Sequence, residues 1–548
     1  MTLSMIDLVI VFGYAFGLIA IATLVSREKA GHTKDSTDYF LAGKTLPWWA
    51  VGASLIAANI SAEQIIGQSG QGYVVGLAIA AYEWQAAIVL LVVAKYFLPI
   101  FLDRNIYTMP QFLDQRFGGG VKSTMAVFWI ALYTAVNLTS VLWLGGLAIN
   151  AVTGLAVLPG MVLLALFAVV YSLYGGLKAV AFTDIIQVVV LIVGGVLITW
   201  IALGLVGDGA GALAGFNTLL SGIPGHFNMI LSPEHPNYGD LPGIWTLLGG
   251  LWVLHFSYWG FNQYIIQRAL GSKSLAEARK GLAFAASLKL LIPVIVVVPG
   301  IAALHLAQNG MLDQAALDAR PDSTYGVLMT LVPTGLRGLV FAALIAAIVS
   351  SLASMMNSIS TIFTMDLYRS FRPKKSEQHY VTVGRVTAFS AMLIALVLAQ
   401  PFLGGMESAF QTIQEYTGFV APGVVAVFIL GFFWKRTNTT GAFALLISSV
   451  VLSFMFWLMA NPAALGGAGQ GLLGLVGLEA LDLPFVVRIW IVFLACLMIG
   501  MLVSIVTGKP VDARAVDVSG IKFATDPVFN MASLAIIATL IGIYVWFW

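Results

Sequence analysis

Long apolar runs follow one another along nearly the whole chain, with only short polar segments between them. Each run holds about 20 residues or more, the length at which a helix crosses a bilayer. Because lipid offers the backbone no hydrogen-bond partners, such segments must fold as helices. The pattern predicts fourteen, near residues 5–25, 48–72, 76–98, 121–150, 156–175, 181–206, 243–268, 279–305, 335–367, 381–402, 406–434, 441–461, 485–507 and 526–548.

Composition indicates an all-α polytopic membrane protein without a separate soluble domain. Of the 548 residues, 59% are hydrophobic and 9% are charged, whereas soluble domains carry about 25% charged residues. The net charge of +2 says little about partners. No nucleic-acid or protein partner is expected, and the lipid bilayer is the expected surrounding. The single cysteine, Cys496, excludes an internal disulfide and a thiol cluster for a metal.

The placement of positive charge predicts the orientation. Arg27 and Lys29 follow the first apolar run and no Lys or Arg precedes it, which is the reverse of a signal peptide. With the N-terminus outside, inner segments hold all of the 27 Lys and Arg residues except Lys289, Arg320, Arg337 and Arg488. This agrees with the positive-inside rule. We expect a multi-pass protein of the bacterial cytoplasmic (inner) membrane with both termini extracytoplasmic.

The number of runs predicts two sets of five helices. An odd number inverts the second set relative to the first, and inverted repeats build many secondary transporters, with the site near the midplane. The expected parts are an extra N-terminal helix and inner loop (1–46), a first repeat (47–206), an outer loop (207–242), a second repeat (243–434) and three accessory C-terminal helices (435–548).

Polar residues interrupt the second run from Asn59 to Gln64, and Glu63 is among them. An acidic side chain within a span is costly and marks a functional site by default. Nearby glycines would let this helix unwind and expose its carbonyls. The alternative is a helix that packs through small residues and uses its polar groups as interhelical bonds.

Two charged residues stand in other runs. Glu83 lies near the start of the third run, where it can also be an interface residue. Lys289 lies roughly 15 Å along a helix from Lys280, too far for its side chain to reach a membrane surface easily. If Glu83 and Lys289 face one cavity, their charges cancel, and the mixed donors and acceptors suit a neutral polyhydroxylated solute. A carboxylate substrate would usually require an Arg, and none stands at these positions.

A hydroxyl-rich helical face follows from the spacing of Ser350, Ser354, Asn357 and Ser358. Such faces commonly pack helices together. Alternatively, the adjacent hydroxyls of Ser350 and Ser351 supply hard oxygen ligands to a small cation. Asp184 in the sixth run is a further candidate, or it caps the helix that starts there.

Six motifs resemble the sodium:solute symporter family, over about residues 35–436. They are Tyr39–Lys44, Ala58–Gln64, Tyr171–Leu177, Phe261–Arg268, Ile348–Ser354 and Gln414–Gly418. The resemblance implies a LeuT-type inverted repeat of five plus five helices, with one helix before and three after. It also implies a symporter that imports its solute with sodium, by alternating access.

The resemblance implies a sodium ion at a break in the helix that carries Asn59, and no other cofactor is expected. The ion ligands would be the carbonyls of Ala57, Ile60 and Ala347 and the hydroxyls of Ser350 and Ser351. Asp184 would stand near the ion's exit to the inside.

For a sugar, the resemblance implies binding through Gln64, Glu83, Lys289 and Gln414. Tyr258 would close the site from inside, with a bond to Asn59. Tyr82 and Phe410 would form the outer aromatic gate.

Three positions depart from the pattern of the family's galactose carriers. His255 in the solute site replaces Asn, Ala86 replaces Ser, and Gln68 replaces a Met of the outer gate. Because sites that bond to substrate hydroxyls discriminate strongly between analogues, a neutral hexose such as galactose or glucose is expected, and the particular sugar stays open. His255 is either a pH-sensitive group or a neutral substitute for the amide.

Other functions remain open at this point. A membrane-embedded enzyme would require a nucleophile–base pair or a metal cluster, and the six histidines are scattered without an HExxH motif. A sodium-independent sugar sensor is a second alternative. A sodium symporter for another solute, such as myo-inositol or an acidic sugar, is a third.

Overall fold

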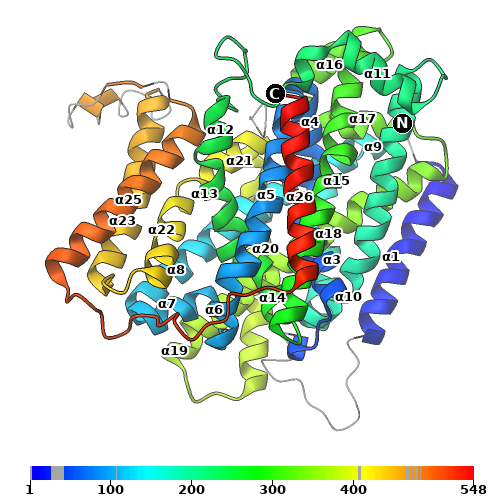
Figure 1. Cartoon of the computed structure of the whole chain (residues 1–548). Helices are drawn as coiled ribbons and strands as arrows, with labels where there is room; N and C mark the ends of the chain where they lie inside the picture. The colour runs from blue at the N-terminus through cyan, green and yellow to red at the C-terminus, as the bar shows by residue number, and fades with distance from the viewer. Residues whose placement is uncertain are drawn as a thin grey trace.

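A computed structural model describes residues 3–25, 42–106, 108–404, 409–463, 470–471, 473–474, 479–481 and 483–548. Within this part the chain forms a bundle of helices with no strand, and only an isolated bridge joins Leu46 to Ser272 (Figure 1). Residues 39–41 of the motif at 39–44 lie outside the described residues, and so do the side chains of the motif at 171–177.

The described part holds nine helices that are long and apolar enough to cross a membrane, or eleven if two bent pairs each count as one span. The bent pairs are Trp48–Asn59 with Glu63–Val74, and Phe410–Thr417 with Ala421–Phe433. Met5–Ile21 and Val157–Val170 are shorter apolar helices. The prediction of an all-helical multi-pass membrane protein is therefore confirmed, whereas the number fourteen stays a prediction.

The helices up to residue 206 are α1 (Met5–Val25), α3 (Trp48–Asn59), a π-helical turn η2 (Glu63–Gly67), α4 (Gln68–Val74), α5 (Ala81–Val92), η4 (Val93–Phe97), α6 (Leu98–Asp103), α7 (Met109–Phe117), α8 (Gly119–Leu132), η5 (Tyr133–Leu138), α9 (Thr139–Thr153) and α10 (Val157–Val206). Helix α10 is continuous over two runs that the pattern predicted as separate helices. No proline stands between the two runs to end the helix.

The next helices are α11 (Ala212–Gly222), α12 (Ile244–Leu248), α13 (Leu251–His255), η7 (Phe256–Gly260), α14 (Gln263–Leu270), α15 (Leu275–Gln308), α16 (Gln314–Ala319), α17 (Thr324–Thr330), α18 (Leu336–Thr361), η9 (Ile362–Tyr368), α19 (Arg369–Phe371) and α20 (Glu377–Leu403). The last are α21 (Ala409–Thr417), α22 (Ala421–Phe433), α23 (Thr439–Ala460), α25 (Phe485–Thr507) and α26 (Pro527–Trp546). The segment predicted as an outer loop thus contains a helix, α11.

Helix α15 packs closely against α3 in the middle of the bundle. A Cβ atom added at Gly52 of α3 would come within 2.6 Å of the Gly281 carbonyl oxygen of α15. The two backbones can therefore approach this closely only because Gly52 has no side chain. This contact holds Asn59 and Lys289, farther along the same two helices, at a fixed separation.

One end of the bundle carries α7, α19 and the segment Gly508–Asp526 that runs from α25 to α26 (Figure 1). We call this the basic end, because it exposes Lys374, Lys375, Lys435, Lys509 and Lys522. Both chain ends lie at the opposite end of the bundle (Figure 1).

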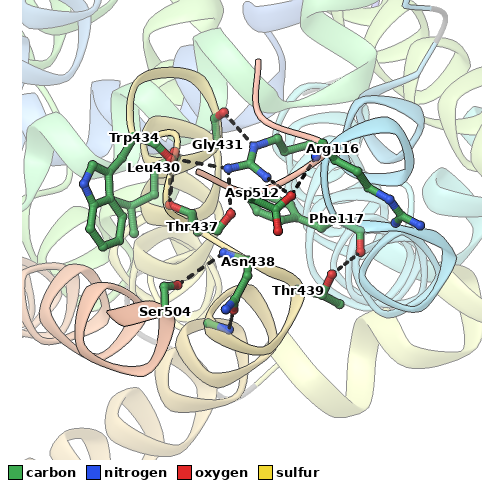
Figure 2. Close-up of polar contacts among 12 residues, drawn as sticks. Arg116, Phe117, Leu430, Gly431, Trp434, Thr437, Asn438, Thr439, Ser504 and Asp512 are labelled. Atoms are coloured by element: carbon green, nitrogen blue, oxygen red, sulfur yellow. Dashed lines mark hydrogen bonds and ion pairs between the residues drawn. The ribbon is translucent and has the colours of Figure 1, made fainter. Parts of the chain in front are cut away.

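Three arginines that the charge pattern assigned to the inner side are buried: Arg116, Arg268 and Arg279. Figure 2 shows Arg116 among carbonyl oxygens at the end of α22. Its guanidinium donates to the carbonyls of Gly431 (3.1 Å), Thr437 (2.6 Å) and Trp434 (3.3 Å), and it pairs with Asp512 at 3.2 Å. Counting charges along the sequence misses this burial, because the carbonyls come from a distant segment of the chain.

Candidate functional site

One cavity gathers polar and aromatic side chains from helices far apart in the sequence. It is lined by all ten residues predicted for the solute and its gates, namely Asn59, Gln64, Gln68, Tyr82, Glu83, His255, Tyr258, Lys289, Phe410 and Gln414. Helices α3, α4, α5, α13, α15 and α21 contribute, together with η2 and η7. Ala86 is buried and is not among the lining residues.

A chain of hydrogen bonds crosses this cavity. Gln68 Nε2 donates to Glu83 Oε1 at 2.8 Å, and the Lys289 ammonium donates to the other oxygen of Glu83. The ammonium also donates to Asn59 Oδ1, and Asn59 Nδ2 donates to the Tyr258 hydroxyl at 3.2 Å. Opposite charges are thus paired inside an apolar bundle, where an isolated charge would be costly.

Aromatic rings border the same cavity. The rings of Tyr82 and Phe410 meet edge to face with centroids 5.1 Å apart, and His255 lies 6.4 Å from Tyr82. A Cβ atom at Gly67 would stand 2.9 Å from Phe410 Cβ, so the glycine lets this ring approach the backbone. Both rings are buried, with Tyr82 6% exposed and Phe410 0% exposed. The two rings therefore form a packed and buried part of the cavity wall.

The helix that carries Asn59 is broken directly after it, as the sequence predicted. Helix α3 and the following Glu63–Val74 helix differ in direction by 59°. The Ser61 N–H donates to Gln64 Oε1 at 3.1 Å, which leaves the Ala57 carbonyl without its usual helical donor. Such a carbonyl is available to a cation.

Helix α18 lies against this break. The Ser351 hydroxyl donates to the Ala58 carbonyl at 3.1 Å, and the Ser350 hydroxyl donates to Asp184. A hydroxyl that donates its proton keeps lone pairs for a cation. Ala57, Ile60, Ala347, Ser350 and Ser351 are all at most 1% exposed. Ser351 thus reaches the broken end of α3, and none of the five residues predicted to hold sodium lines the cavity.

Asp184 is the centre of a second buried network. It lies inside α10, accepts from the Ser54 hydroxyl at 2.5 Å and pairs with Arg268 at 3.4 Å. The idea that Asp184 caps a helix is therefore wrong. Arg268 also donates to the hydroxyls of Ser54 (2.7 Å) and Ser354 (2.5 Å). The sequence did not predict the role of Arg268 in this network, because the residue stands at the end of an apolar run, where a loop was expected to begin.

Glu63 and Asn137 also line the cavity. The sequence marked Glu63 as a functional candidate without a particular role, and it did not single out Asn137. The Ser140 hydroxyl donates to Glu63 at 2.5 Å. Asn137 Oδ1 has no hydrogen-bond partner within the described residues. The site therefore carries two carboxylates and one ammonium, not the single balanced pair that was predicted. The signal was present, because Asn137 and Ser140 interrupt an apolar run just as Asn59 and Glu63 do.

A helical multi-pass bundle with a buried polar cavity next to a broken helix defines a membrane transporter. The sequence profile of the Sodium:solute symporter family matches residues 39–448. The chain belongs to this family, whose members are sodium-coupled transporters and not enzymes.

Relatives and solved structures agree with this assignment. The chain is 48% identical over 557 aligned residues to the sodium/glucose cotransporter of Vibrio parahaemolyticus, covering 100% of this chain and 99% of that protein. It is 36% identical to sodium/myo-inositol cotransporter 2 of Mus musculus, covering 76% of this chain and 65% of that protein. A solved sodium-coupled sialic acid symporter in an outward-open state has the same fold, with a TM-score of 0.76, 22% identity, and coverage of 93% of this chain and 100% of that one.

Proposed function

We propose that this protein imports a neutral sugar, a hexose such as glucose or galactose, together with sodium. The observation that supports this most is the bonded series Gln68–Glu83–Lys289–Asn59–Tyr258 in one cavity next to a broken helix. A polyhydroxylated guest can donate to the carboxylate and accept from the ammonium and the amides.

Sodium is proposed to bind at the break between α3 and η2. The carbonyls of Ala57, Ile60 and Ala347 and the hydroxyls of Ser350 and Ser351 would be its ligands, because oxygen donors suit a small hard cation. Asp184 lies one hydrogen bond from Ser350 and would stand on the ion's way out. Sodium and sugar would favour each other's binding through the shared helix end, and this coupling is reciprocal.

The gates are proposed to work at opposite sides of the sugar. Tyr82, Phe410 and Gln68 would open outward, and Tyr258 would open inward. Asn59 bonds to Tyr258 and to Lys289, so the gate residue and the sugar residues share one partner.

We propose a LeuT-type arrangement of fourteen spans, with repeats at 47–206 and 243–434 between one preceding helix (1–46) and three accessory helices (435–548). The interrupted helices support it, because α3–η2 begins the first repeat and the divided stretch α12–α14 begins the second. The loop at 207–242 and both termini would face outward, and the basic end would face the cytoplasm of a bacterium.

The ion gradient supplies enough free energy for accumulation. One sodium entering down 100 mV releases about 2.3 kcal/mol, and a tenfold gradient adds about 1.4 kcal/mol. With one ion per sugar, the two together sustain a sugar ratio of roughly several hundred to one.

Myo-inositol is the second candidate solute, because mammalian relatives carry that name and inositol offers the same hydroxyl chemistry. An acidic sugar is disfavoured by Glu63, a second carboxylate in the cavity wall. No described arginine lines the cavity, and the buried Arg268 is already paired with Asp184.

The test is uptake into proteoliposomes after a sodium jump. We expect labelled glucose or galactose to accumulate with sodium outside and not with potassium. Competition by myo-inositol and by glucuronate ranks the candidate solutes. Accumulation that is equal in both salts refutes symport, and stronger competition by glucuronate than by any neutral sugar refutes the assigned solute.

A further inference from the structure

A groove on the surface of the bundle lies where three helices begin. Trp48 of α3, Lys280, Phe284 and Ser287 of α15, and Val528 and Ala532 of α26 are among its lining residues. The three helix starts meet at the basic end, because Glu277 of α15 accepts from the Trp48 N–H and Arg279 binds the carbonyl of Ala524 just before α26. The groove is separate from the transport cavity.

The groove is cationic at one end and apolar along the rest. Among the described residues that line it, Lys280 alone is charged. From Lys280 to Ser287 the helix rises about 10 Å away from the basic end. Val528 and Ala532 follow the same direction along α26. The groove therefore has a positive charge, Lys280, at the basic end and an apolar lining along the rest of its length.

The charge at this end of the groove is available to a ligand. Glu277 is engaged by the Trp48 N–H at 2.8 Å, and Asp526 caps α26 by accepting from the Phe529 N–H at 3.0 Å. Lys280 is exposed and forms no ion pair in the part of the chain that the structure describes. Trp48 is 39% exposed beside it, which is typical of a tryptophan at the headgroup level of a bilayer.

We propose that this groove binds one anionic phospholipid, with an acyl chain along Phe284 and Ala532 and the phosphate at Lys280. Burial of apolar chain supplies binding free energy, and a lysine close to the membrane surface favours anionic headgroups. A second groove on α26, lined by Trp84, Leu247 and Ile541 among others, has no charged lining residue. This second groove therefore offers no charge that would select an anionic headgroup. The two grooves differ in this respect by Lys280.

The proposal is tested by native mass spectrometry of the full-length protein with equal amounts of phosphatidylglycerol and phosphatidylcholine that share the same acyl chains. The wild type should retain phosphatidylglycerol about fivefold better, the factor expected from one lysine near the surface. Lys280→Gln should bring the ratio close to one. Lys273→Gln, an exposed lysine at the same end but outside the groove, is the matched control and should leave the ratio unchanged.

A second measurement locates the lipid. Ala532→Trp should fill the groove and lower retention of both lipids, and a photoreactive phosphatidylglycerol should label wild-type peptides that hold Phe284 or Val528. The labelling decides the matter if Ala532→Trp fails to fold. Equal retention of the two lipids by the wild type overturns the proposal. So does an equal loss in Lys273→Gln, or labelling only at other segments.

Discussion

The transport cavity and the Arg116 cluster are both buried polar networks, but they differ in how completely their atoms are bonded. In the Arg116 cluster, Nε and both terminal nitrogens have oxygen partners (Figure 2). In the cavity, Gln68 Oε1, the Tyr82 hydroxyl, His255 Nε2 and Asn137 Oδ1 have none within the described residues.

The difference distinguishes a structural network from a binding site. A buried polar atom without a partner costs free energy, so a network that serves only stability should satisfy each of its members. Burial lowers the pKa of the Arg116 guanidinium and Asp512 opposes this shift, yet an arginine stays charged. The unpaired atoms of the cavity are available to a guest with several hydroxyls.

The largest expected effect is on folding. Arg116→Gln removes the donors to the carbonyls of Gly431 and Thr437 and leaves Asp512 without its ion-pair partner. Asp512 is 24% exposed, but each buried carbonyl left without a donor costs about 1–3 kcal/mol, so thermal unfolding in detergent should occur at a much lower temperature. Arg372→Gln, at an exposed arginine of the same end, is the control. An unchanged unfolding temperature in Arg116→Gln would show that the Arg116 cluster does not stabilise the fold.

The next effect separates transport from stability. The double variant Glu83→Gln/Lys289→Gln removes both charges of the cavity pair together, so no unpaired charge stays buried. Sodium-driven sugar uptake should fall about 100-fold or more, because a hydrogen bond to a charged group contributes about 1.5–3 kcal/mol. The unfolding temperature should stay near that of the wild type. Retained uptake, or unfolding as early as in Arg116→Gln, contradicts the binding role.

A smaller effect is expected at the ion. Ser351→Ala removes one oxygen ligand, and one such bond contributes about 1 kcal/mol. The sodium concentration for half-maximal uptake should rise about fivefold, and sugar affinity at fixed sodium should fall in parallel. Ser358→Ala, a buried serine of the same helix that bonds to Gln267, is the control. Equal sodium dependence in the two variants would argue against the proposed ion ligands.

The smallest effect is expected at the surface of the basic end. Lys435 and Asp517 form an exposed pair at 3.4 Å, and such pairs contribute little in water. Lys435→Gln should unfold at the wild-type temperature and take up sugar at the wild-type rate. A clear loss of stability would show that the exposure of an ion pair does not predict its contribution to stability, and the contrast between Lys435–Asp517 and Arg116–Asp512 would fail.

The sequence was most informative where a charge interrupts apolar surroundings. Glu83 and Lys289 stand out because a bilayer tolerates few charges, and the structure pairs them. The break after Asn59 was predicted for the same reason, from polar residues and glycines within one span. These features depend on local sequence and on the solvent, so no knowledge of tertiary contacts was required.

The partners of the other buried charged residues depend on tertiary contacts. Arg116 was expected in a loop, but it bonds to a carbonyl 315 positions away along the chain. A local sequence pattern cannot predict a partner at that separation. Arg268 and Glu63 belong to polar motifs that the sequence did identify, yet their partners, Asp184 and Ser140, come from other helices. The assignment of individual roles within a motif therefore requires the packed bundle.

The Asn59 side chain bonds to two residues at once, one through each end of its amide group. Its amide oxygen accepts from Lys289 and its amide nitrogen donates to the Tyr258 hydroxyl. A guest molecule that takes over the ammonium frees that oxygen, and the amide group can then turn. If Tyr258 closes the site from inside as proposed, this one short side chain would couple solute binding to the inner gate without a long-range movement of the bundle.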